Sequence, residues 1–195
     1  MGNSRRQEII NAARELYETK GLSRTSVKDI TDVVGVTRTL FYRYFPDKQS
    51  VTTAVLDDYV ADFLEALQYW NAQRKVGNIE HALDSVVKLL KTSLSERDSF
   101  RKALTSRENA ELYIEFINMV ADRIASYIVD TTVQDYAKFH SVEIDHVYET
   151  FYVLIVGIVG YLRMHPSVDD AVLKNIIAQT LHMERGVDTV QQPSE

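Results

Sequence analysis

The fold is decided by the stretch TSVKDITDVVGVTRTLFYRYFPDK, residues 25–48. It holds two short segments whose apolar residues recur at helical spacing, and only Gly35 and Val36 separate them. Thr25 or Ser26 can cap the first helix and Thr37 can cap the second, which Pro46 stops. The sequence therefore predicts a helix-turn-helix, in which a tight turn sets the second helix at a steep angle to the first.

Helical periodicity continues on both sides of this stretch. An amphipathic helix with Ile9, Ile10 and Tyr17 precedes it and ends at Gly21, and Asp47 is the expected cap of a long helix that Gly77 breaks. Later expected segments lie at about 78–94, 100–104, 108–139, 142–164 and 168–183, with the β-branched cluster 129–133 weakening the third of these. With 7 glycines and 3 prolines in 195 residues, we predict an all-α fold of about nine helices.

Charge is divided unevenly along the chain. The whole sequence carries −6, but residues 1–50 hold nine basic and six acidic residues, a net charge of +3 that leaves −9 for the rest. A basic N-terminal domain on an acidic remainder can still bind phosphate, because a local patch neutralises it. The charge pattern therefore agrees with a helix-turn-helix whose second helix enters a DNA major groove.

Several classes of protein are disfavoured by composition. The chain has no cysteine, which excludes disulfides and thiolate metal sites. The N-terminal segment lacks the apolar stretch of a signal peptide, which favours a cytoplasmic protein. The most apolar run, 151–162, is shorter than the roughly 20 residues that cross a bilayer, so we expect a buried helix and no membrane partner.

The chain resembles the TetR family of transcriptional regulators over roughly residues 5–56. The resemblance is carried by Gly21, by 25–30, by Gly35-Val36-Thr37 and by the run FYRYFPDK at 41–48. It implies a three-helix DNA-binding domain, expected here at 1–50, and a helical ligand-sensing and dimerisation domain at 51–195. It also implies a dimeric regulator, most simply a repressor of a pseudo-palindromic operator that a small apolar or aromatic effector releases. Thr39 and Leu40 depart from the Gly and Thr that family members often carry, so the operator cannot be borrowed from a relative.

Candidate DNA-binding residues lie at the starts of three helices and along the second helix of the motif. Arg38 can make a bidentate contact to guanine, Tyr42 can reach phosphate, and Lys48 begins the long helix, where the dipole favours an anion. Alternatives remain for each of them: a solvated Arg38, a core Tyr42 and a purely capping Thr25 or Ser26. The full set is Thr25, Ser26, Thr37, Arg38, Thr39, Tyr42, Arg43 and Lys48. A flexible arm with Arg5 and Arg6 could also reach DNA, although a solvated terminus explains it equally well.

The acidic remainder supplies candidates for an effector pocket and for a dimer interface. Pockets between bundle helices are mostly apolar, so an aromatic-rich interior suits an apolar or aromatic ligand, although a filled core uses the same residues. The pocket candidates are Phe63, Trp70, Phe100, Tyr113, Phe116, Tyr127, Tyr148, Phe151 and Tyr152. Small residues let a second helix approach closely, which gives the interface candidates Gly157, Gly160, Ile176, Ile177 and Leu181.

The sequence also bears on two other classes of function, an enzyme and a helical adaptor. An enzyme is not predicted, because the sequence has no Gly-x-Ser-x-Gly, His-Glu-x-x-His or Walker-type loop, and no cofactor is expected. Glu143 and His146 form a single Glu-x-x-His step, but a bundle metal site needs a second copy, so no metal is expected. A helical adaptor or sensor without sequence-specific DNA binding stays open, because of Thr39, Leu40 and the net acidity.

Overall fold

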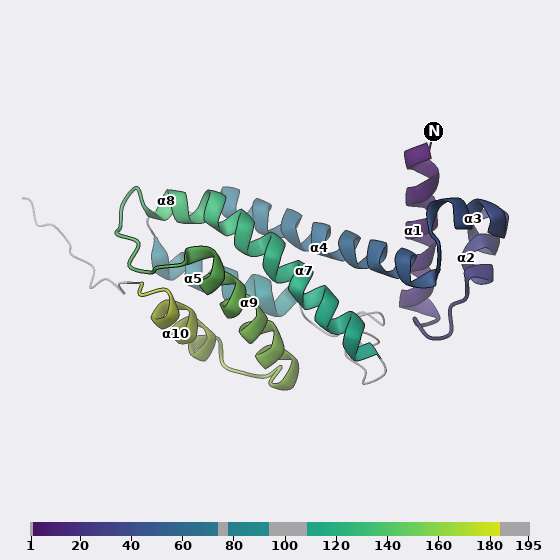
Figure 1. Cartoon of the computed structure of the whole chain (residues 1–195). Helices are drawn as coiled ribbons and strands as arrows, with labels where there is room; N and C mark the ends of the chain where they lie inside the picture. The colour runs from purple at the N-terminus through teal and green to yellow at the C-terminus, as the bar shows by residue number, and fades with distance from the viewer. Residues whose placement is uncertain (1, 74–77, 94–108, 184–195) are drawn as a thin grey trace, which may run out of the picture. The chain divides into compact units, whose positions relative to one another are not determined.

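Helices form every regular element of the computed structural model, which describes residues 2–73, 78–93 and 109–183 (Figure 1). This confirms the predicted all-helical class. The predicted segment at 100–104 lies outside the described residues. The elements are α1 Gly2–Thr19, α2 Val27–Val34, α3 Arg38–Tyr44, α4 Lys48–Gln73, α5 Ile79–Ser93, α7 Ala110–Ile128, the π-helical turn η2 Val129–Val133, α8 Gln134–Tyr136, α9 Val147–Met164 and α10 Asp170–Thr180.

The chain divides into two compact units. The described part of the first, which we call the head unit, is 2–65 and 109–120; that of the second, the rear unit, is 66–73, 78–93 and 121–183. Helices α4 and α7 contribute residues to both units. The functional boundary expected near residue 50 stays a prediction.

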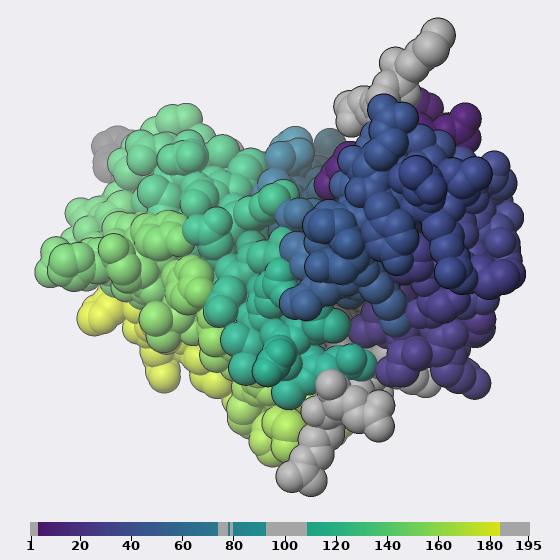
Figure 2. Space-filling model, turned by 45° about the vertical axis from the view of Figure 1, so that its right-hand side comes forward, coloured from purple at the N-terminus to yellow at the C-terminus, as the bar shows by residue number. Residues whose placement is uncertain are grey.

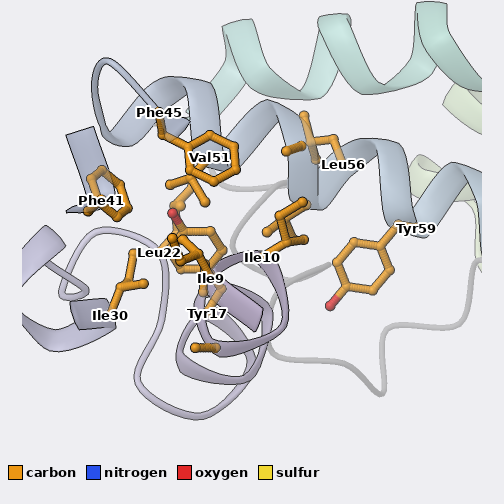
Figure 3. Close-up of a cluster of buried hydrophobic side chains, with 14 residues drawn as sticks. Ile9, Ile10, Tyr17, Leu22, Ile30, Phe41, Phe45, Val51, Leu56 and Tyr59 are labelled. Carbon is orange, nitrogen blue, oxygen red and sulfur yellow. The ribbon is translucent and has the colours of Figure 1, made fainter. Parts of the chain in front are cut away.

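The head unit is built around a fully buried apolar cluster that joins its helices (Figure 3). Apolar residues spaced three and four apart give α1 one buried face, and residues of α2, α3 and the first half of α4 close over it. Leu112, Phe116 and Met119 of α7 pack against the same cluster. The least exposed members are Ile9, Ile10, Ala13, Tyr17, Ile30, Phe41, Val51, Val55 and Leu56.

Polar contacts add to this packing between α1 and α4. The Arg14 guanidinium donates to Asp62 across 2.6 Å and lies 4.1 Å from the centre of the Tyr59 ring. The Tyr59 hydroxyl donates to Glu18, and the Tyr17 hydroxyl is 2.8 Å from Thr52 Oγ1. The first half of α4 is therefore held to the head unit by packing and by side-chain hydrogen bonds.

In the rear unit, ion pairs and hydrogen bonds join α10 and α4 to their neighbours. Helix α10 packs against α5 and α9, and the Lys174 ammonium lies 2.5 Å from Asp84 and 3.3 Å from Glu80 of α5. Trp70 Nε1 donates to Ser85 Oγ at 2.7 Å, which joins α4 to α5. The two ion pairs of Lys174 hold one face of α10 against α5.

Two predicted helix boundaries are corrected. The helix expected at 142–164 begins at Val147, because His146 adopts a left-handed conformation with φ of 49°, which a right-handed helix cannot continue through. The last helix is shorter than expected, Asp170–Thr180 instead of 168–183. The predicted weakening at 129–133 is confirmed as the π-helical turn, where the Thr131 hydroxyl donates to the Tyr127 carbonyl across 2.6 Å.

Helix α9 is buried on one face only, so the expectation of a buried helix holds for that face and is wrong for the other. Ile155, Ile158 and Leu162 point inward, whereas Val153 and Met164 are largely exposed. Within the described residues it is the one helix long and apolar enough to cross a membrane, with a mean hydropathy of 1.4. One face of α9 is therefore apolar and not covered by the described residues of its own protomer.

Candidate nucleic-acid interface

Side chains at both ends of α2 fix the first helix of the motif. Ser26 Oγ accepts the Asp29 backbone N–H at 3.2 Å, and an Asp29 carboxylate oxygen accepts the Ser26 N–H at 2.7 Å, which completes a capping box. The Lys20 ammonium lies 2.8 Å from the same carboxylate. Hydrogen bonds from Lys20 and from Ser26 hold the pKa of Asp29 well below its usual range. The capping box and the ion pair with Lys20 thus hold the first turn of α2.

The turn between α2 and α3 depends on one glycine and one threonine. Gly35 ends α2 with φ of 71°, a left-handed conformation that glycine adopts without strain, and the Val36 N–H reaches back to Thr31 at 3.0 Å. Thr37 Oγ1 accepts the Leu40 N–H at 3.2 Å and begins α3. The predicted helix-turn-helix is therefore present, with the caps that the sequence indicated.

Helix α3 presents a polar face to solvent. Phe41 is fully buried and anchors the helix in the cluster of Figure 3, and its ring meets the Tyr42 ring edge-on at 5.4 Å. Tyr42 is itself 52% exposed, so the alternative of a core tyrosine is wrong for this residue. The exposed residues from the start to the last turn of α3 are Thr37, Arg38, Thr39, Tyr42 and Arg43. In Figure 2 the surface of this part of the chain is drawn in blue.

Two other predicted DNA contacts are engaged inside the head unit. Thr25 is 2% exposed and its hydroxyl donates to the Gly21 carbonyl at 2.9 Å. Lys48 Nζ donates to the Leu22 carbonyl at 2.7 Å. Burial lowers the pKa of Lys48, and the nearby Asp29 charge opposes that shift. Neither polar group was expected to bond to the loop between α1 and α2, because a backbone carbonyl leaves no signature in the sequence.

The N-terminal residues that could have formed a flexible arm are helical. Arg5 pairs with Glu8 at 2.5 Å within α1, and the Arg6 guanidinium lies 5.0 Å from the Phe45 ring centre. That cation–π contact places a positive charge beside the end of α3. The sequence suggests a role for Arg6 only in a flexible arm, and nothing in the residues near Arg6 indicates Phe45 as its partner.

The predicted effector residues fall into both units. Phe63, Tyr113 and Phe116 belong to the head unit, and Phe116 packs against its core. In the rear unit, Tyr127 accepts a hydrogen bond from Asn71 at 3.2 Å, and Tyr148 donates to Asp122 at 2.7 Å. Trp70, Phe151 and Tyr152 are half-buried there, whereas Phe100 lies outside the described residues. An effector site made of these residues stays a prediction.

A groove of about 580 Å³ lies between α9 and α10 on the rear unit. Gly157 and Ile176, two of the predicted interface residues, line it together with Val153, Leu154, Ile158, Tyr161 and Leu173 among others. Gly160 and Leu181 are half-buried, whereas Ile177 is buried in its own protomer. Among the described residues, none of the predicted effector residues lines this groove.

The family match to known proteins lies within the head unit. Residues 9–55 match the sequence model of bacterial regulatory proteins of the tetR family. The transcriptional regulator EthR of Mycolicibacterium smegmatis is 36% identical over 59 residues, which is 30% of this chain and 27% of EthR. The chain thus spans between about a quarter and a half of the length of the curated relatives it matches.

Solved structures share the fold over almost the whole chain. The TetR family repressor AlkX from Dietzia sp. strain DQ12-45-1b superposes with a TM-score of 0.67 and 18% identity, covering 91% of this chain and 95% of AlkX. RolR in complex with resorcinol superposes with a TM-score of 0.60 and 19% identity, covering 93% of this chain and 87% of RolR. The rear unit therefore shares a fold with these proteins at an identity too low to carry residue roles.

Proposed function

We propose that this chain is a member of the TetR family of bacterial regulatory proteins and a DNA-binding transcriptional regulator that acts as a dimer. On this proposal the chain is a regulator and not an enzyme, which the family match of residues 9–55 supports. The observation that carries the proposal is the exposed polar face of α3, set at a fixed angle by the caps of α2 and α3. Its place of action is the bacterial cytoplasm, where the DNA is.

On this proposal, α3 is the recognition helix. Thr37, Arg38 and Thr39 lie at its N-terminal end, the end that reads base edges in helix-turn-helix proteins. Arg38 is exposed and long enough for a bidentate contact to guanine, which discriminates by about 1–3 kcal/mol. Tyr42 and Arg43 lie further along α3, where they contact phosphate. Ser26 caps α2, because its hydroxyl donates to the Asp29 carboxylate at 2.6 Å and accepts the Asp29 backbone N–H.

The proposed dimer uses the groove between α9 and α10. A β-carbon built on Gly157 or on Gly160 meets nothing within 4 Å in the protomer, although a glycine inside a helix costs about 1 kcal/mol relative to alanine. Small residues at these positions are explained if a second copy of α9 approaches closely. The exposed Val153 and Tyr161 beside Gly157 supply the apolar area for that contact. A twofold dimer also accounts for the exposed face of α9 without a membrane.

The proposed effector is a small apolar or aromatic molecule bound in the rear part of the chain. Proteins with this fold include RolR, whose structure contains resorcinol, and AlkX, which is implicated in biodegradation of n-alkanes. Half-buried aromatic side chains are available at Trp70, Tyr127 and Phe151. The effector acts by binding one arrangement of the dimer more tightly than another, and a coupling of about 1–3 kcal/mol changes operator affinity by roughly 5–150-fold. We propose repression that the effector relieves.

The experiment that tests this function is a selection of bound genomic fragments followed by gel shift on the recovered site. Arg38→Ala and Tyr42→Ala should each abolish the shift at protein concentrations that saturate the wild type, while size-exclusion chromatography still shows the dimer. Lys138→Ala, at an exposed position of the rear unit paired with Asp135, is the matched control and should bind as the wild type does. Unchanged binding by both head variants would overturn the assignment of α3.

A salt titration separates this proposal from an adaptor without sequence-specific DNA binding. A regulator should bind a random-sequence duplex with an affinity that falls steeply as salt rises, because its cations release counterions from phosphate. An adaptor should show no binding at low salt and no slope. The second outcome, together with an empty genomic selection, would favour the adaptor.

A further inference from the structure

The Arg6 side chain lies against the end of α3, although the residue itself belongs to α1. Its guanidinium carbon lies over the Phe45 ring, 5.0 Å from the ring centre. Phe45 ends α3 and is 2% exposed, and its ring centre is 5.8 Å from that of Phe41 in the cluster of Figure 3. The core of the head unit therefore gives the Arg6 guanidinium a fixed apolar surface to rest on, beside the last turn of α3.

The N–H groups of this guanidinium are not used by the protein. Arg6 is exposed, and within the described part of the chain the contact with Phe45 is its one side-chain interaction. An aromatic ring attracts the cation, but it offers no oxygen to the five N–H donors of an arginine. Because a guanidinium can rest on a ring and still present a planar fork of donors, Arg6 is held in place with its donors free for an anion.

Most cations near Arg6 in the sequence differ from it in this respect. Nine basic residues lie in 1–50, and four of them form ion pairs with carboxylates: Arg5, Arg14, Lys20 and Lys28. The five that form no ion pair among the described residues are Arg6, Arg24, Arg38, Arg43 and Lys48. Three of these five lie on α3 or against its end. Unpaired positive charge in the head unit thus gathers around the helix that we propose reads DNA.

We propose that Arg6 is a further DNA-contacting residue: Phe45 holds its guanidinium at the C-terminal end of α3, where it donates to a backbone phosphate. The inference rests on the proposed DNA binding and deepens it. It replaces the flexible arm considered in the sequence with a side chain fixed before DNA arrives, which loses less side-chain entropy on binding. Such a contact orients the head on the duplex and reads no base.

A purely structural role for Arg6 predicts a different result. A cation at the C-terminal end of a helix interacts favourably with the helix dipole, so Arg6 would then stabilise α3 without touching DNA. A phosphate contact releases counterions when DNA binds, whereas a contact inside the protein does not. The salt dependence of DNA affinity therefore separates the two roles.

The test uses fluorescence anisotropy over a series of NaCl concentrations, with a random-sequence duplex and with the selected genomic site. Arg6→Met removes the charge and keeps a long apolar side chain against Phe45. We expect it to flatten the slope of log K against log salt by about 1.8 for a dimer with two heads on DNA. It should weaken binding to both duplexes by the same factor, because a phosphate contact is independent of sequence.

Arg5→Met is the matched control, because Arg5 is the neighbouring exposed arginine of α1 and is paired with Glu8 at 2.5 Å. It removes the same charge, and we expect it to keep the slope of the wild type. Arg6→Lys keeps the charge without the planar fork, so it should bind more weakly with an unchanged slope. Arg6→Gln should flatten the slope as Arg6→Met does, and it answers the same question if Arg6→Met does not fold.

Two results would overturn the inference and leave the proposed function standing. The first is a wild-type slope in Arg6→Met and Arg6→Gln, with a lower midpoint of urea unfolding, which would make Arg6 structural. The second is equal flattening by Arg5→Met, which would mean that the total charge of α1 matters and the place of Arg6 does not. A wild type without salt-dependent binding would overturn the proposed function itself, and this inference with it.

Discussion

The head unit and the rear unit are specified in different ways. In the head, the short helices α2 and α3 each begin at a side-chain cap, and Phe41 and Ile30 are completely buried within the same chain. In the rear, α9 begins at His146 without a side-chain cap and leaves Val153 exposed. Local signals and a closed core thus suffice for the head, whereas the rear has an apolar face that its own protomer does not cover.

We expect the largest change from a charged residue in the proposed dimer interface of the rear unit, which leaves the head unit unaltered. Val153→Glu places a carboxylate on the exposed face of α9, where the single protomer tolerates it because Val153 is 68% exposed. In the proposed dimer both copies of this charge are buried without a partner, at a cost of about 4 kcal/mol, which is roughly 1,000-fold in the dimer dissociation constant. Sedimentation equilibrium measures this change.

The matched control for that variant is Val142→Glu, an exposed valine of the rear unit that does not line the groove. It should leave the dimer unchanged. Equal dimerisation by Val153→Glu and the wild type would mean that another surface holds the two copies together.

Truncating one isoleucine in the core of the head unit and one in the groove of the rear unit compares how much each side chain contributes to the free energy of unfolding. Ile10 is 1% exposed in the head cluster, and Ile10→Ala should lower the free energy of unfolding by about 3 kcal/mol through lost burial and a cavity. Ile176→Ala removes the same atoms from a side chain that is 37% exposed in the groove, so the loss should be much smaller in a monomeric Val153→Glu background. Urea unfolding compares the two, and similar losses would contradict the difference between the units.

Some features of both units could be predicted from the sequence, and others could not. The caps Thr37 and Asp47, the turn at Gly35 and the β-branched break at 129–133 were predicted, because each depends on neighbours within a few residues. For α2 the sequence left Thr25 and Ser26 open, and the cap is Ser26. The start of α9 was missed, since its apolar pattern fades gradually and the left-handed His146 has no local signal. The bond from Lys48 to Leu22 was missed because its acceptor is a backbone atom 26 positions away.

A smaller effect removes one of the local signals on which the head depends. Ser26→Ala leaves the Asp29 N–H at the start of α2 without its side-chain acceptor, and we expect unfolding to become easier by about 1 kcal/mol. Ser26→Gly, which leaves that amide open to water, should cost only a few tenths of a kcal/mol. Thermal and urea unfolding measure both. A loss of 3 kcal/mol or more would mean that Ser26 does more than cap α2.

Gly157→Ala should have opposite effects on the protomer and on the dimer. Nothing lies within 4 Å of the added carbon, so the monomeric Val153→Glu background should gain up to about 1 kcal/mol of stability from the better helix former. In the dimerising chain the same methyl group should weaken association, because it separates the two α9 helices. A stabilised protomer with unchanged dimerisation would remove Gly157 from the interface.

We expect the smallest change in the free energy of unfolding at low pH, where Asp29 and Asp47 become protonated. Hydrogen bonds from Lys20 and Ser26 lower the pKa of Asp29, and those from the Ser50 hydroxyl and backbone N–H lower that of Asp47. Because the folded pKa lies below the unfolded one, both groups stabilise the fold fully above about pH 4, and this contribution is lost as pH falls further. The stability difference between wild type and an Asp29→Asn, Asp47→Asn variant should therefore narrow below pH 4 in urea unfolding. A difference that stays constant down to pH 2 would contradict this.

In the proposed regulator, the head unit reads DNA and the rear unit sets the spacing of the two heads. A hydroxyl-radical footprint of the wild-type protein on its selected genomic site tests both parts at once. We predict two protected segments related by a twofold axis, with centres one helical turn apart, about 10–10.5 base pairs, or a multiple of it. A single protected segment at protein concentrations that saturate the gel shift would contradict the spacing of two heads by the rear unit. No protected segment would contradict DNA reading by the head unit.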